Sequence, residues 1–182
     1  MNKLLLFFIF IQSVAICQNG TDKQIARQGQ VTFFSYTSAE NIEAVNNQAY
    51  SILDTETNEI AVDILMKAFV FKKKLMREHF NESYIESDLY PKAKFRGKIV
   101  GFDPSQEGSQ TRMIEGMFTL KDTTVPLAFK VTIERKSTSY KIIGDAEVLL
   151  ENYDIKIPKL LSPNIAKNIQ VSFNFEFKPY EK

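Results

Sequence analysis

Few residues of a type that could carry out chemistry occur in this sequence. It contains one histidine, His79, with Glu78 and Glu82 close by. A metal site here would have to recruit a further carboxylate, an uncommon ligand set for zinc, and the two glutamates are explained more simply as the solvated face of a helix. The sequence has no Gly-rich phosphate loop, no His-Glu-x-x-His and no Gly-x-Ser-x-Gly motif. We therefore expect no enzyme, no metal and no cofactor.

The same side chains could instead contact a bound molecule. His79 is either a ligand-facing group or a structural histidine, and the structural role is the more common one for a single histidine. Arg77 and Arg96 could hold an anionic group through paired hydrogen bonds, although single arginines are more often ordinary surface residues.

The N-terminus has the layout of a secretory signal peptide. Lys3 is followed by the apolar run of residues 4–11 and then by a more polar stretch. This run is much shorter than the roughly 20 apolar residues that a membrane-spanning helix needs. We expect residues 1–17 to be a signal peptide and the mature protein to be periplasmic or secreted.

Cleavage by the ordinary signal peptidase requires small residues at the last and third-last positions, which Cys17 and Ala15 supply, so Gln18 becomes the new N-terminus. A lipoprotein anchored at Cys17 is the alternative, but lipidation favours a small residue before the cysteine and Ile16 is large. Because Cys17 is the only cysteine, no internal disulfide can form.

Composition limits the partners. The chain has 23 Lys and Arg against 22 Asp and Glu, and removal of Lys3 leaves 22 of each. Nucleic-acid binding depends on a basic surface, so we expect no nucleic-acid partner. The hydrophobic fraction of 44%, with 15 phenylalanines, allows a sizeable core. No linker or repeat divides residues 18–182, which we expect to form one domain.

Alternation of apolar and polar residues dominates this domain and predicts β-strands with one buried face. About eight strands are predicted, at residues 30–37, 44–53, 60–68, 92–101, 111–121, 125–133, 138–151 and 169–178. Short turns between the later strands indicate an antiparallel meander. Such strands form either one sheet closed into a barrel or two stacked sheets.

Three glycines, Gly97, Gly116 and Gly144, fall on the apolar face of their strands. They either leave interior volume for a ligand or relieve strain where the strands coil sharply, and both can hold together.

Two segments interrupt the alternation, residues 72–91 and 152–167. The first is predicted to be a short helix followed by a loop, and its large side chains recur at three- and four-residue spacing: Leu75, Met76, His79, Phe80 and Tyr84. Long irregular insertions in compact domains are usually functional or mobile. Both segments are apolar enough to cover a barrel mouth, and we expect the first to form a lid.

Several motifs follow one another in the order and spacing of a known family. They are Val31 and Phe33; His79-Phe80; Tyr90, Pro91, Ala93 and Phe95; Gly116, Phe118, Thr119 and Leu120; Thr124 and Pro126; and Tyr153-Asp154-Ile155-Lys156. On these residues the chain resembles the YceI-like proteins, exported lipocalin-like barrels associated with polyisoprenoid lipids. The resemblance covers most of the mature chain. It implies an all-β fold, an eight-stranded antiparallel lipocalin-like barrel with a short helix or loop as lid.

Together, the resemblance and the apolar inner face predict a carrier that holds an apolar lipid, an isoprenoid such as a polyprenyl or quinone lipid, inside the barrel. The expected ligand-binding residues are Phe33, Met66, Leu75, Met76, His79, Phe80, Tyr84, Phe95, Gly97, Gly116, Phe118, Gly144, Phe173 and Phe175. A filled barrel that acts as an interaction or stress-related structural module is the alternative, and a hydrolase using paired carboxylates a more remote one. A homodimer is left open.

Overall fold

The computed structural model describes residues 22–36, 41–155 and 166–181. The expected signal peptide, with Cys17 and the cleavage site at Gln18, lies outside the described residues. Residues 156–165 of the second irregular segment also lie outside them. The described elements are β1 (Lys23–Ser35), β2 (Ile42–Asp54), β3 (Glu59–Leu65), η1 (Met66–Ala68), β4 (Val70–Phe71), α1 (Lys74–His79), η2 (Phe80–Tyr84), β5 (Lys92–Val100), β6 (Gly108–Leu120), β7 (Thr123–Lys136), β8 (Ser139–Leu149), η3 (Leu150–Tyr153) and β9 (Asn168–Pro179).

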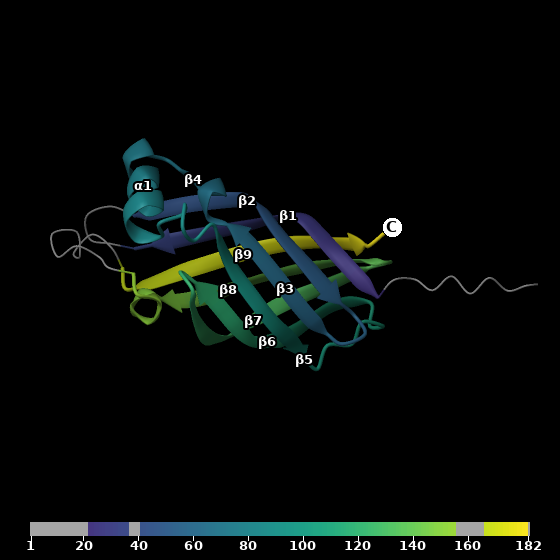
Figure 1. Cartoon of the computed structure of the whole chain (residues 1–182). Helices are drawn as coiled ribbons and strands as arrows, with labels where there is room; N and C mark the ends of the chain where they lie inside the picture. Colours follow the sequence, from purple (N-terminus) through teal and green to yellow (C-terminus); the bar gives the residue numbers. More distant parts are fainter. Residues whose placement is uncertain (1–21, 37–40, 156–165, 182) are drawn as a thin grey trace, which may run out of the picture.

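Eight of the strands close into an antiparallel barrel (Figure 1). Their hydrogen-bonded order is β1-β9-β8-β7-β6-β5-β3-β2, and β2 pairs back with β1 from Lys23 opposite Asp54 to Ser35 opposite Ile42. The two-residue strand β4 pairs with β2 at Ala44 and Val45, beyond the stretch that pairs with β3. The predicted eight-stranded antiparallel barrel is confirmed, and β4 is an addition that the alternation did not predict.

Side chains alternate between the two faces along most of the barrel wall, and the register shifts of β1 between Ala26 and Val31 interrupt the alternation. On β5, Ala93, Phe95 and Ile99 are buried, whereas the cationic side chains between them are exposed. A strand places successive side chains on opposite faces, so the apolar positions of the sequence form the barrel interior.

The barrel has two different ends. One carries β4, α1 and the tight turn between β6 and β7, and we call it the α1 end (Figure 1). In that turn Lys121 and Asp122 have φ of 48° and 60°, the type I′ geometry that suits a two-residue hairpin. Pairing therefore continues up to Leu120 opposite Thr123. Among the described helices, none is long and apolar enough to cross a membrane.

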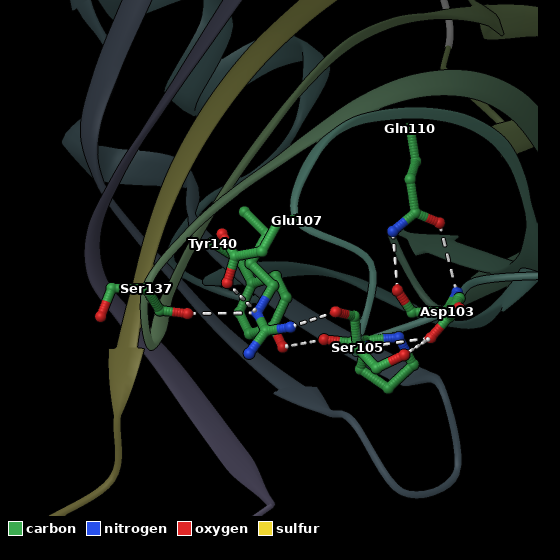
Figure 2. A network of polar contacts seen from close by, with 8 residues as sticks. Asp103, Ser105, Glu107, Gln110, Ser137 and Tyr140 are labelled. Atoms are coloured by element: carbon green, nitrogen blue, oxygen red, sulfur yellow. Dashed lines mark hydrogen bonds and ion pairs between the residues drawn. The ribbon is translucent and has the colours of Figure 1, made fainter.

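The opposite end is filled by the loop of residues 101–107. Phe102 is 5% exposed, and its ring meets that of Tyr140 edge-on with centroids 5.8 Å apart. The Tyr140 hydroxyl donates to the carbonyl oxygen of Pro104 at 2.9 Å (Figure 2). Burial raises the pKa of Tyr140, so this hydroxyl stays protonated and able to donate.

A polar network holds the same loop in place (Figure 2). Gln110 Nε2 donates to the carbonyl oxygen of Asp103 at 2.7 Å, and Asp103 Oδ1 accepts from Ser105 Oγ at 2.6 Å. These hydrogen bonds from Ser105 favour the ionised carboxylate and lower the pKa of Asp103. Arg135 Nη1 donates to the carbonyl oxygen of Ser105 at 2.6 Å. The network ties the loop to β6 and β7 and keeps this end closed.

Candidate ligand-binding site

A cavity of about 350 Å³ lies inside the barrel at the α1 end. Among the described residues that line it, three carry polar side chains: Ser35, His79 and Tyr84. The apolar lining consists of Phe33, Ile42, Ile64, Met66, Phe69, Phe71, Met76, Phe80, Ile85, Ala93, Phe118, Leu120, Val148, Leu150, Ile155, Ile169 and Val171. A concave, mostly apolar cavity of this size with a few convergent polar groups is typical of small-molecule sites.

Four phenyl rings pack together beside this cavity, and we call them the mouth cluster: Phe33, Phe69, Phe71 and Phe80. The ring of Phe80 stacks on Phe33 at a centroid distance of 5.5 Å and touches Phe71 at 5.1 Å and Phe69 at 5.7 Å. The cluster joins β1, the turn after η1, β4 and the start of η2. An isolated helix as short as α1 is marginal in water, so this packing holds it on the barrel.

Polar contacts tether the same segment further along the chain. We call residues 74–87 the lid segment. Lys121 Nζ pairs with Glu86 Oε2 at 2.6 Å, and its ammonium lies 5.7 Å from the centroid of the Tyr90 ring. Within the segment, Ser87 Oγ donates to Asn81 Oδ1 at 2.6 Å. The turn between β6 and β7 is thereby connected to the end of the lid segment.

The polar groups of the cavity differ in their bonding. Ser35 Oγ accepts the backbone N–H of Ala166 at 3.0 Å. In the described part of the chain, the side chains of His79 and Tyr84 form no hydrogen bond. Burial raises the pKa of the Tyr84 hydroxyl, which therefore remains a hydrogen-bond donor. Two polar groups in an otherwise apolar wall are thus free to bond to a ligand.

A second cavity of about 70 Å³ continues the first one toward the middle of the barrel, since both are lined by Ile64, Phe118 and Val148. Its whole lining is apolar. Five phenyl rings form a row here, with successive centroids 5.3, 5.4, 6.1 and 6.1 Å apart: Phe95, Phe129, Phe173, Phe175 and Phe177. We call them the aromatic row, and all but Phe177 line the second cavity.

Most of the residues predicted to bind a ligand lie in these walls. The first cavity is lined by Phe33, Met66, Met76, His79, Phe80, Tyr84 and Phe118, and the second also by Phe95, Phe173 and Phe175. Whether they contact a ligand stays a prediction. Neither lining includes Leu75, Gly97, Gly116 or Gly144.

The expectation that the three glycines leave open volume is wrong. A Cβ on Gly97 would lie 2.8 Å from the Phe95 ring, one on Gly116 2.7 Å from the same ring, and one on Gly144 2.9 Å from the Phe173 ring. The space beside each glycine is therefore already filled by a phenyl ring. Leu75 is 61% exposed on the outer side of α1, because the predicted spacing covered more than one face of the helix.

The arginines considered for an anionic ligand face outward. Arg96 Nη2 pairs with Asp63 Oδ1 at 2.5 Å on the outer surface, and Lys92 lies 3.5 Å from the same carboxylate. Partial burial raises the pKa of Asp63, but the hydrogen bond and charge of Arg96 and the charge of Lys92 outweigh it, so the pKa is lowered. Arg77 is exposed on α1. Among the described residues, no three His, Cys, Asp or Glu side chains gather where they could hold a metal ion.

Several lining residues were not selected from the sequence. Phe69 and Phe71 belong to the mouth cluster, Ile85 is the 4% exposed residue of the lid segment that lines the first cavity, and Phe129 lies in the aromatic row. The alternation of residues 125–133 already placed Phe129 inside the barrel. Phe69 and Phe71 carried the same signal at two-residue spacing, but they follow the end of a predicted strand.

Several solved structures share this fold. A polyisoprenoid binding domain from Saccharophagus degradans has a TM-score of 0.74 at 11% identity, with 88% of this chain and 99% of that chain covered. BcnA from Burkholderia cenocepacia has a TM-score of 0.69 at 14% identity, with 81% and 95% covered. The YCEI protein of Campylobacter jejuni has a TM-score of 0.58 at 8% identity, with both chains covered completely. At these identities the likeness concerns the fold.

A family model extends the likeness to the sequence, whereas no curated protein sequence gives a significant match. The model of the YceI-like domain matches residues 23–177. This span begins at the first residue of β1 and ends two residues before the end of β9, so it contains nearly the whole barrel together with the lid segment and both cavities. The chain therefore belongs to the YceI-like family.

Proposed function

We propose that this protein is a carrier that binds an apolar lipid in the cavity at the α1 end, with the polar head of the lipid near His79 and Tyr84. The observation that carries the proposal is the cavity of about 350 Å³ with its almost wholly apolar wall. Burial of apolar surface contributes roughly 25 cal/mol per Å². A long hydrocarbon tail therefore gains much by leaving water for this cavity.

The isoprenoid class of the lipid is supported by the family. The similar domain of Saccharophagus degradans is described as polyisoprenoid binding, and this chain shares its fold and belongs to the YceI-like family. The apolar walls suit a hydrocarbon tail, and His79 and Tyr84 could bond to a polar head.

The chemistry of the lining supports binding rather than catalysis. Among the described lining residues of the two cavities, none carries a carboxylate or a thiol, and their polar groups are one hydroxyl of serine, one phenol and one imidazole. The cavity also weighs against the alternative of a completely filled barrel that acts as an interaction or structural module. A hydrolase with paired carboxylates has no such pair in the lining.

Export of the carrier is supported by the sequence of residues 1–17 alone. The intact mass of the protein purified from its own cells should correspond to a chain that begins at Gln18. A diacylglyceryl adduct on Cys17 would instead assign the protein to a membrane surface as a lipoprotein.

Native mass spectrometry of the protein purified from its own cell envelope tests the carrier function, with the bound lipid extracted and identified. A matched pair of variants on β9 sharpens the test, because Val171 lines the cavity and its neighbour Gln170 is exposed. Val171→Glu should abolish the lipid-bound species, since an unpaired charge in an apolar wall is costly, and Gln170→Glu should keep it. A wild-type protein that carries no apolar molecule and takes up none would refute the proposal.

A further inference from the structure

We propose that the barrel interior ends in a floor beneath Phe129 and Phe173, and that this floor limits the enclosed tail to about three isoprene units. The inference rests on the carrier function proposed above and adds the length of the lipid to it. It is carried by the burial of the inward-facing side chains along the strands.

On two strands, β7 and β9, the inward-facing side chains change from partly to fully buried along the strand. Three inward-facing side chains of β7 are only partly buried: Val125, Leu127 and Phe129. The next inward-facing side chain, Val131, is 2% exposed. The strand β9 repeats this change between half-buried and fully buried positions. On β7 the change falls where pairing with β8 begins, at Val131 opposite Gly144, so the open space beside Phe129 ends where these two strands join.

Four side chains from four neighbouring strands close the barrel at that level, and we call them the floor: Ile114, Val131, Ile142 and Phe175. Each is at most 3% exposed. The ring of Phe175 packs over Gly29 of the neighbouring strand β1, because a Cβ on Gly29 would lie 2.1 Å from it. Below the floor, Ile99, Ile133 and Phe177 have no exposed surface at all.

The depth above the floor sets the tail length. From Ile169 to Phe173, both in cavity linings, β9 runs for four residues, which is about 13 Å along the strand and about 10 Å along the axis of a barrel with tilted strands. An isoprene unit adds four bonds of about 1.5 Å and extends a chain by roughly 5 Å. Two units therefore fill this depth, and we expect a third unit in the part of the first cavity between Ile169 and the lid residues Met76 and Phe80, which line the same cavity.

Affinity for prenyl alcohols of increasing length measures the floor directly. Each methylene that becomes buried strengthens binding about fourfold. The purified protein, freed of lipid, should bind a prenyl alcohol of three isoprene units more than about tenfold more tightly than one of two units. Its affinity should rise less than about twofold from three units to four or to eight, since the further units stay outside the barrel. Competition between pairs of alcohols in native mass spectrometry gives these ratios.

One variant removes part of the floor, a second enlarges the cavity above it, and a third serves as control. Phe175→Ala removes the floor ring of the second cavity and Phe129→Ala widens that cavity, so each should shift the affinity plateau to four units or more. Phe177→Ala removes a ring of the same aromatic row that lines neither cavity, and the plateau should stay at three units. Phe129 is only partly buried, so its variant should fold even if Phe175→Ala does not, and circular dichroism checks each.

The possible results separate the two proposals. Affinity that keeps rising to eight units in the wild-type protein overturns the floor and leaves the carrier function standing. A plateau that stays at three units in both Phe129→Ala and Phe175→Ala also overturns it. No binding of any prenyl alcohol overturns the isoprenoid carrier itself.

Discussion

Replacement of Phe80 by alanine should release the lid segment from the barrel without unfolding the barrel. Phe80 is the only member of the mouth cluster that belongs to this segment, and its ring touches the other three members. The backbone N–H of Ile85 donates to the carbonyl oxygen of Phe80 at 2.9 Å. The backbone N–H of Ser87 donates to the carbonyl oxygen of Asn81 at 2.8 Å. These two amides therefore report on the opening of the segment.

The size of the effect follows from burial. Truncation of a fully buried phenylalanine costs about 3 to 5 kcal/mol. Phe80 is partly buried, so we expect the docked state to lose about 2 kcal/mol, roughly half of that range. Since 1.4 kcal/mol corresponds to a factor of ten, the open state should become about thirtyfold more populated.

Hydrogen exchange measures that population, because an amide that exchanges through local opening reports the free energy of that opening. In Phe80→Ala the amides of Ile85 and Ser87 should exchange about thirtyfold faster than in the wild-type protein. The amides that pair β6 with β7 should be unchanged. Leu75→Ala is the matched control, since Leu75 lies in the same segment but is 61% exposed.

Three results would refute this reasoning. Exchange of Ile85 at the wild-type rate would mean that the mouth cluster does not hold the lid segment. An equal effect of Leu75→Ala would mean that helix propensity, not ring packing, decides docking. Faster exchange throughout β6 and β7 would mean that the segment and the barrel unfold together.

Three further predictions concern the wall and the head group. Gly116→Ala should lower the free energy of unfolding, measured in urea, by about 2 kcal/mol or more, because the added Cβ would lie 2.4 Å from the carbonyl oxygen of Arg96. Met117→Ala, at the exposed neighbouring position, is the control and should lower it by less than about 0.5 kcal/mol. Equal losses in the two variants would contradict the steric argument. The pKa of Asp63 is lowered from 3.8 in the folded state, so its pairs stabilise the protein above that pH and lose their effect as the pH falls through the lowered pKa. Asp63→Asn should thus lower the free energy of unfolding by less than about 1 kcal/mol at pH 7 and should not change it at a pH well below 3.8. If the variant stays less stable than the wild-type protein in acid, the ion pairs of Asp63 are not the cause. Tyr84→Phe should weaken binding of a prenyl alcohol about fivefold but not that of a prenyl hydrocarbon of equal length; equal losses for both would assign the ring to packing alone.

The strands could be predicted because the face that a side chain takes depends only on its neighbours in sequence. Residues 169–178 became β9 with Phe175 and Phe177 inside, as their alternation indicates. The same local logic placed Phe33 in the wall, and the helical spacing placed Met76 and Phe80 on the side of the lid segment that faces the cavity.

The filling of the interior depends on contacts between distant parts of the chain, and the alternation of residues does not predict such contacts. Gly97 lies directly opposite Gly116 because of the register between β5 and β6, and this register lets the Phe95 ring cover both. Phe71 reaches the mouth cluster because β4 pairs with β2 at Ala44, which alternation cannot predict. A glycine on an apolar face indicates space for a side chain, but the register decides whether a ligand or a ring occupies it.

The position of β1 in the barrel has a consequence for the order in which the chain can fold. β1 lies between β2, which follows it at once, and β9, which is the last strand. The bond between Ser35 and Ala166 spans 131 residues. The entropy lost in closing such a loop grows with its length, and folds dominated by distant pairings form slowly.

A chain that leaves the ribosome from its N-terminus therefore presents one edge of β1 without a neighbour until nearly all of it has been made. Unpaired strand edges are templates for association with other chains. A product that stops before Asn168 would keep that edge permanently, since it lacks β9 altogether. Such a truncated protein should aggregate even though seven of the eight barrel strands are present.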